Sequence, residues 1–164
     1  MDYAAHVLNL INYITGSRLI DAKGTFMPDI FSKEVDDAVY STLYLENGLK
    51  GQLSVNWSDD THRKMTTSLK IEGDRGKLEA DATTLKIYLK EDNVEENLKK
   101  GWNIKYITDL TEQVFFNLRG EEYSSEVDHF IQCIKIGGLN QRSSFESALH
   151  TDYIINKLIE DANN

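Results

Sequence analysis

The sequence predicts an α+β fold, in which a largely antiparallel, open sheet has helices packed on one face. Three observations support this prediction. Residues 2–15 have apolar side chains at the spacing of a helix. Residues 35–108 alternate apolar and polar side chains and contain turns with glycine, as consecutive hairpin strands do. Residues 125–159 contain two further segments of helical periodicity, each opened by a capping pattern.

The first helix is expected to cover residues 2–15 and to end at Gly16, because glycine readily adopts the left-handed conformation that follows a helix. Most of its large side chains are apolar. The exceptions recur at the helical repeat and form a narrow polar stripe along one side: Asp2, His6, Asn9 and Tyr13. Burying unpartnered polar groups is costly, so such a stripe faces either bulk solvent or a ligand cleft. Spacing alone leaves both interpretations open.

The first strands follow a connecting segment. Residues 17–33 contain the single proline of the chain and predict a connection with one short strand near Ile20. Residues 39–45 have a period of two, which is typical of a half-buried strand. Residues 46–48 (Glu-Asn-Gly) predict a hairpin turn, because Asn and Gly tolerate positive φ. Residues 49–57 are then expected to return antiparallel.

Four more strands are predicted, at residues 65–71, 77–80, 85–89 and 104–108. The Gly-Asp-Arg-Gly turn at residues 73–76 connects the first two of them. The charged stretch 91–100 is interpreted as a solvated excursion.

Two capped helices are predicted to close the chain. Ser125 with Asp128 forms a capping-box pattern, and Gly137 follows the expected end of that helix. Ser143 with Glu146 repeats the capping pattern before the last apolar segment.

Length and composition indicate a single globular domain over residues 1–164, large enough to bury about two thirds of the surface of the unfolded chain. The net charge is −9, and no cluster of Lys and Arg offsets it, so nucleic-acid binding is not expected. Cys133 is the only cysteine, which excludes a disulfide framework and fits a reducing cytoplasm. No leader-like or membrane-spanning apolar run is present, so no membrane partner is expected.

The predicted sheet has one apolar face and one face rich in tyrosine and hydroxyl groups. The second face carries Tyr40, Thr42, Tyr44, Ser54, Asn56, Thr66 and Ser68. Solvated faces usually carry more Lys and Glu. The face is therefore either an ordinary exposed surface or a subunit interface, and the sequence favours neither.

Two other kinds of site are not expected in this chain. No GxGxxG or Walker-type loop follows a predicted strand, so the chain has no phosphate cradle of its own. Asp59, Asp60 and His62 could in principle hold a metal ion. A polar loop is favoured instead, because a metal site of this kind needs a preorganised third or fourth ligand.

Six groups of residues resemble the second domain of the Gfo/Idh/MocA oxidoreductases. In chain order they are Asp2-Tyr3-Ala4-Ala5-His6, Glu34-Val35-Asp36-Asp37, Asn47-Gly48 with Gly51 and Trp57, Ile71-Glu72-Gly73-Asp74-Arg75-Gly76, Tyr123 with Glu126 and Phe130, and Ser144 with Ala148-Leu149 and Thr151. The resemblance runs from the first residues to the last, and the order of the predicted elements agrees with it.

The resemblance implies a longer protein with an N-terminal Rossmann domain that binds NAD or NADP, of which this chain would be the second half, cut just before its catalytic helix. The substrate would be a sugar, a cyclitol or a nucleotide sugar. His6 would take the proton from a substrate hydroxyl as the substrate carbon gives hydride to the nicotinamide, and Asp2 would orient the substrate or the imidazole. Asn9 and Tyr13 would contact the substrate.

The same resemblance implies that this chain binds no cofactor, is inactive without its Rossmann domain, and contributes the interface of a homo-oligomer. Two departures from the family pattern are visible. Ala4 replaces a frequent glycine, which is harmless to the mechanism, whereas Asn9 replaces a frequent aspartate and removes a charge from the stripe. Two rival interpretations stay open: a non-catalytic ligand-binding or dimerisation module, and a cofactor-free acid–base enzyme that uses Asp2 and His6.

Overall fold

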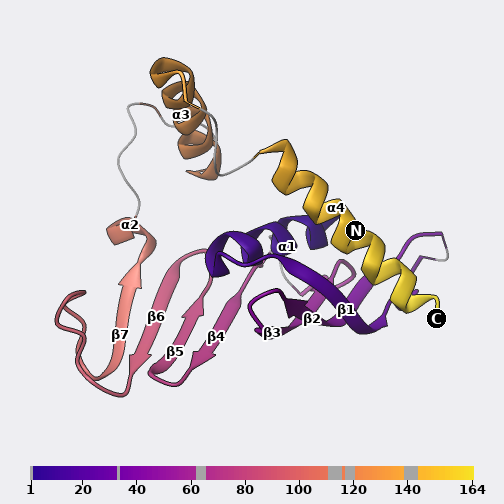
Figure 1. Ribbon diagram of the computed structural model, residues 1–164, viewed down its shortest axis with the longest axis horizontal. Coiled ribbons are helices and arrows are strands. Elements are labelled where there is room, and N and C mark those ends of the chain that lie inside the picture. Colours follow the sequence, from indigo (N-terminus) through magenta and orange to yellow (C-terminus); the bar gives the residue numbers. More distant parts are fainter. Residues whose placement is uncertain (1, 33, 62–65, 111–115, 117–120, 139–143) are drawn as a thin grey trace. The chain divides into compact units, whose positions relative to one another are not determined.

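The computed structural model describes residues 2–32, 34–61, 66–110, 116, 121–138 and 144–164 (Figure 1). Helices and two antiparallel sheets confirm the α+β prediction. The contacts of the chain gather in two compact units, Met1–Thr61 with Gln132–Asn164, and His62–Ile131. The units are treated separately below, and the single domain expected from the sequence stays a prediction. No described helix has the length and apolar composition needed to cross a bilayer.

The first unit begins with helix α1 (Asp2–Thr15), which has the predicted bounds. Gly16 follows it with a φ of 60°, so the glycine provides the left-handed residue expected at the helix end. Ala4 and Leu8 are fully buried, while His6 on the opposite side is exposed. The helix is therefore amphipathic, as its apolar spacing predicts.

A three-stranded antiparallel sheet follows, with strands β1 (Leu19–Phe26), β2 (Ala38–Leu45) and β3 (Lys50–Asn56) in sequence order. Strand β1 includes Ile20, where a short strand was predicted. Strands β2 and β3 form the predicted hairpin, and Tyr40 lies opposite Ser54. Along β2 the inward side chains of Val39, Leu43 and Leu45 are buried. The alternation read from the sequence is thus confirmed.

The core of this unit lies between the sheet and two helices, α1 and α4 (Phe145–Ala162) (Figure 1). Its buried members are Ala4, Leu8, Leu19, Ala22, Val39, Leu43, Leu45, Leu53, Ile154 and Leu158. Burying a leucine side chain contributes about 1.5–3 kcal/mol, so this cluster is the main source of the stability of the unit. It also fixes α1 on the sheet, which determines where the polar stripe points.

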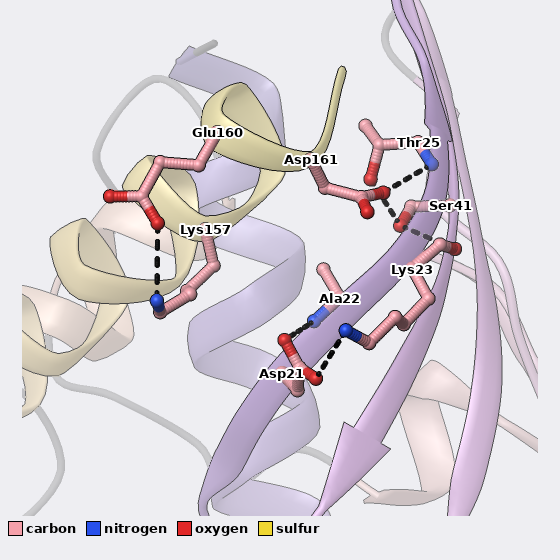
Figure 2. Close-up of polar contacts among 8 residues, drawn as sticks. All are labelled: Asp21, Ala22, Lys23, Thr25, Ser41, Lys157, Glu160 and Asp161. Carbon is pink, nitrogen blue, oxygen red and sulfur yellow. Dashed lines mark hydrogen bonds and ion pairs between the residues drawn. The ribbon is translucent and has the colours of Figure 1, made fainter. Parts of the chain in front are cut away.

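A polar contact joins the C-terminal end of α4 to β1, and Figure 2 shows its members. The Asp161 carboxylate accepts a hydrogen bond of 2.6 Å from the backbone N–H of Thr25 (Figure 2). This hydrogen bond lowers the pKa of Asp161. The Thr25 and Ser41 hydroxyl oxygens lie 2.8 Å apart and link β1 to β2. The contact therefore ties the helix to two strands next to an irregularity in their pairing.

The second unit contains a four-stranded antiparallel sheet in sequence order, formed by β4 (Leu69–Gly73), β5 (Gly76–Ala80), β6 (Thr84–Leu89) and β7 (Gly101–Tyr106). The Asp81 carboxylate accepts hydrogen bonds from the backbone N–H groups of Thr83 and Thr84, which holds the β5–β6 turn. These bonds, with those from the two hydroxyl groups, lower the pKa of Asp81. Val94 and its acidic neighbours are exposed, as expected for the excursion 91–100.

Four predicted boundaries are wrong. Strand β4 begins at Leu69 rather than at residue 65, and residues 66–68 lie outside any strand. Strand β7 spans Gly101–Tyr106 rather than 104–108, and the short helix α2 (Ile107–Leu110) follows directly. Strand pairing decides this, because Trp102 lies opposite Tyr88 and Tyr106 opposite Thr84. The Asp109 carboxylate then accepts the backbone N–H of Tyr106, which opens the helical turn.

The other two boundaries concern helix starts. Helix α3 (Glu121–Ile136) begins before Ser125, so this serine is not its N-cap. The N-cap of α4 is Ser144, whose hydroxyl accepts the backbone N–H of Ser147 at 3.1 Å. The predicted cap, Ser143, lies outside the described residues.

Candidate functional site

A shallow hollow of about 280 Å³ lies on the exposed side of α1. Its lining is His6, Asn9, Leu10 and Tyr13. Three of these four are residues of the predicted polar stripe, which the helical repeat aligns on one side. Sequence reasoning missed Leu10. Its position one helical turn after His6 could have indicated that it lies on the same side of α1.

The three stripe residues in the hollow differ in their surroundings. His6 is exposed, and the Tyr13 side chain is 59% exposed. Of Asp2 the structure describes only the backbone at the start of α1, so its predicted side-chain role lies outside the described part of the chain. A ligand in the hollow would thus meet an imidazole, a phenol and an apolar side chain, which suits a molecule with hydroxyl groups and C–H surface.

Asn9 is held by the C-terminal helix. Its side-chain amide donates a hydrogen bond of 3.4 Å to the hydroxyl of Thr151 on α4. Thr151 is only 4% exposed, and its hydroxyl donates in turn to the Ser147 carbonyl at 3.0 Å. Asn9 therefore has a structural role as well as a place in the hollow. No pattern in the sequence indicates this partner.

An aromatic pair extends this side of the first unit. Tyr3 on α1 and Trp57, the residue after β3, meet edge to face with ring centroids 4.5 Å apart. Trp57 is nevertheless 64% exposed. Its backbone N–H donates to the Asp37 carbonyl at 2.8 Å, which fixes the main chain beneath the indole.

Asp37 itself is buried and organises the connection between β1 and β2. One of its carboxylate oxygens accepts backbone N–H groups at 2.7 Å from Ile30, 2.6 Å from Phe31 and 2.9 Å from Ser32. These bonds, that from Ser32 foremost, lower the pKa of Asp37. An acidic side chain that neutralises several backbone donors is a structural anchor. Asp37 therefore positions Trp57 rather than a ligand.

The tyrosine and hydroxyl side chains predicted for one face of the first sheet do share that face. The face also carries the charge of Lys50, which the sequence analysis did not include. Tyr40 is 37% exposed and stacks on Phe26 with ring centroids 6.5 Å apart. Lys50 lies opposite Tyr44, and its ammonium group sits over the Tyr44 ring at 5.2 Å from the centroid. Thr66 and Ser68, assigned to the same face from the sequence, belong to the second unit.

The described residues do not fit a nicotinamide dinucleotide. Its pyrophosphate is typically held by a glycine-rich turn between a parallel strand and a helix N-terminus. Every described strand pair is antiparallel, so the described residues contain no such unit. Among them no cluster of three metal-ligating side chains is found either. Of the loop residues considered as metal ligands, His62 lies outside the described part.

Residues 1–79 match the model of the GFO/IDH/MocA C-terminal domain. Among curated proteins nothing matches the chain significantly.

Solved structures share the fold over nearly the whole chain. A levoglucosan dehydrogenase in complex with NADH and levoglucosan is 18% identical, with a TM-score of 0.77 over 99% of this chain and 47% of its own. An oxidoreductase domain protein from Kribbella flavida is 19% identical, with a TM-score of 0.74 over 99% and 47%. The WlbA dehydrogenase from Bordetella pertussis, in complex with NADH and UDP-GlcNAcA, is 16% identical, with a TM-score of 0.64 over 100% and 42%.

The chain thus spans about half the length of the structures it resembles, and it corresponds to their C-terminal part. The family model covers α1 and the first sheet, which carry the hollow and the aromatic pair. These findings confirm the resemblance to the Gfo/Idh/MocA C-terminal domain: the family model matches residues 1–79, and the fold is shared over nearly the whole chain.

Proposed function

We propose that this chain is the substrate-binding part of a nicotinamide-dependent dehydrogenase that acts on a sugar, a cyclitol or a nucleotide sugar. The observation that carries the proposal is the hollow on α1, with an exposed histidine in its lining, on a fold shared with a levoglucosan dehydrogenase. An exposed imidazole nitrogen can accept a proton. This is the chemistry that oxidation of an alcohol needs at the hydroxyl group.

Each stripe residue has a role in this proposal. His6 accepts the proton of the substrate hydroxyl at an imidazole nitrogen. Asp2, one turn earlier, orients the imidazole or the substrate. Asn9 and Tyr13 donate or accept hydrogen bonds at other hydroxyl groups of the substrate. In this arrangement His6 and Asp2 are catalytic residues, and the other two set the position of the substrate.

The nicotinamide would be held elsewhere. It supplies the hydride acceptor when bound, and the described residues of this chain do not fit its pyrophosphate. We therefore assign the cofactor, NAD or NADP, to a Rossmann domain in a longer protein that contains this chain. The 164-residue chain alone is proposed to bind no cofactor and to be inactive.

The hollow has a volume of about 280 Å³, close to the lower end of small-molecule pockets at roughly 300 Å³, and it is open to solvent. It has room for a sugar-like ring, and a longer ligand such as a nucleotide sugar would extend beyond it. The structural relatives were solved in complex with both kinds of molecule, levoglucosan in one and UDP-GlcNAcA in another.

Self-association is proposed through the outer face of the first sheet. Exposed aromatic side chains such as Tyr40 are enriched in interfaces, and a flat sheet face can pair with its own copy about a two-fold axis. The rival interpretation, a ligand-binding or dimerisation module without catalysis, keeps this interface and loses the role of His6.

The experiment that separates these interpretations uses the longer protein with His6→Gln. A general base typically contributes about 10²- to 10⁴-fold to the rate, so kcat should fall by that order while KM changes little. Tyr13→Phe is the control variant, because it removes one hydroxyl from the hollow and should affect KM more than kcat. An unchanged kcat in His6→Gln would favour the module without catalysis.

A further inference from the structure

Trp57 is an unusual surface residue, because its ring is exposed and yet fixed in place. The indole is 64% exposed, but Tyr3 supports it edge to face at 4.5 Å. The Trp57 backbone N–H donates to the carbonyl of Asp37, whose carboxylate accepts three further backbone N–H groups. An exposed ring that is already immobilised loses little conformational entropy when a ligand covers it.

The position of Tyr3 places Trp57 next to the hollow. Tyr3, His6 and Leu10 follow the spacing i, i+3 and i+7, which aligns them on one side of α1. One helical turn, a rise of about 5.4 Å, separates Tyr3 from the hollow residues on that side. The Trp57 ring therefore contacts a side chain that lies on the same side of α1 as the hollow residues.

The chemistry of an indole face suits a sugar ring. A pyranose has one face of C–H groups and a rim of hydroxyl groups. The π-face of tryptophan is large, apolar and partially negative, so it attracts C–H groups and leaves hydroxyl groups free to reach polar partners. His6 and Tyr13 in the hollow are such partners.

We propose that Trp57 is a stacking platform at the edge of the α1 hollow, which takes the C–H face of the sugar-like ring while the hydroxyl groups of that ring reach His6. The inference rests on the proposed function and names a specificity-determining residue for it. Trp57 selects for a ring with an apolar face. Tyr3 is a positioning residue, since it contacts the indole, and Asp37 acts further away by fixing the main chain at Trp57.

The chain contains an internal control for this proposal. Trp102 on β7 is 53% exposed and contacts Tyr88 at a centroid distance of 5.4 Å, so it is also an exposed indole supported by a tyrosine. It belongs to the second unit, whereas α1 and its hollow belong to the first. These two residues are the only tryptophans of the chain.

The test is an NMR titration of the ¹⁵N-labelled 164-residue chain with levoglucosan into the millimolar range. The two indole N–H signals report on the two tryptophans, and Trp102→Phe assigns them. The proposal predicts that the Trp57 indole and the His6 backbone amide shift with one common saturation curve, while the Trp102 indole does not follow it. Trp57→Leu should raise the apparent Kd by roughly threefold to tenfold, whereas Trp102→Leu should leave it unchanged.

Trp57→Phe guards against a folding defect, because it retains an aromatic face and should bind with an intermediate Kd. A saturable shift of the α1 amides without the Trp57 indole would overturn the platform and leave the proposed substrate site standing. If neither the α1 amides nor the Trp57 indole showed a saturable shift, both the Trp57 platform and the proposed substrate site on α1 would be contradicted. A response of the Trp57 indole alone, or equal responses of the two indoles, would also overturn it.

Discussion

The side-chain amide of Asn9 on α1 is hydrogen-bonded to the hydroxyl of Thr151 on α4, and 142 positions separate the two residues in the chain. The bond connects the helix that carries the candidate site to the last helix of the chain. It is long, at 3.4 Å, so its own contribution to stability is modest. The Thr151 hydroxyl is buried and also donates to the Ser147 carbonyl, so its removal takes away two hydrogen bonds rather than one.

We predict that Thr151→Val lowers the free energy of unfolding by about 0.5–1.5 kcal/mol, since valine has the same shape but no hydroxyl. Urea denaturation followed by circular dichroism measures this. Thr151→Ser keeps the hydroxyl and controls for it. In a double-mutant cycle with Asn9→Ala the two changes should not be additive. Additive effects would show that the Asn9–Thr151 bond does not contribute.

Asp37→Asn is predicted to destabilise the chain at neutral pH, because the carboxylate accepts three backbone N–H groups and an amide oxygen accepts them more weakly. These bonds lower the pKa of Asp37 in the folded state, so its stabilising effect is present above the ordinary carboxyl pKa, about 3.9, and is lost as pH falls through the lower folded value.

The difference in unfolding free energy between wild type and Asp37→Asn should therefore be constant from near-neutral pH down to about pH 5 and should shrink only in stronger acid. Denaturant titrations across this range measure it. Asp36→Asn, at the exposed neighbouring aspartate, is the matched control and should change little. If the difference in unfolding free energy grew as the pH fell, the lowered pKa of Asp37 would be contradicted.

The 164-residue chain is predicted not to bind NAD or NADP. A pyrophosphate requires close approach of backbone N–H groups at a helix N-terminus after a parallel strand, and the described strands pair only antiparallel. Isothermal titration calorimetry with both cofactors measures this, with the longer dehydrogenase as the positive control. Saturable binding at micromolar concentration would refute the prediction.

Self-association through the outer face of the first sheet is predicted to depend on Tyr40. Tyr40 is exposed and stacked on Phe26, whereas Tyr44 lies under the Lys50 ammonium group, so a carboxylate at position 44 would gain a cation as its neighbour. Tyr40→Glu introduces an unpaired charge at the contact and should shift the protein to monomer.

Sedimentation equilibrium at 150 mM salt measures this, since screening beyond about 8 Å limits the repulsion from the net charge of −9. Tyr13→Glu on α1 is the control and should not alter the mass. A wild-type chain that is monomeric at tens of micromolar concentration, or an oligomer indifferent to Tyr40→Glu, would contradict the proposed interface.

The features determined by the sequence itself are local ones. The bounds of α1, the left-handed Gly16 after it and the β2–β3 hairpin all follow from contacts between residues a few positions apart. The alignment of His6, Asn9 and Tyr13 follows from the repeat of a single helix. Short-range geometry fixes these features wherever the element lies, so a pattern is sufficient to predict them.

Features that depend on partners distant in sequence were decided only by the tertiary structure. Cross-strand pairing placed β7 earlier than its alternation suggested, Thr151 became the partner of Asn9, and Tyr3 became the support of Trp57. The contacts of Asn9 and Tyr3 form only when α1, the first sheet and α4 pack around their common core. The bounds of β7 are set only when the second sheet pairs. Their free energy comes from packing and exclusion of water, which a one-dimensional pattern does not record.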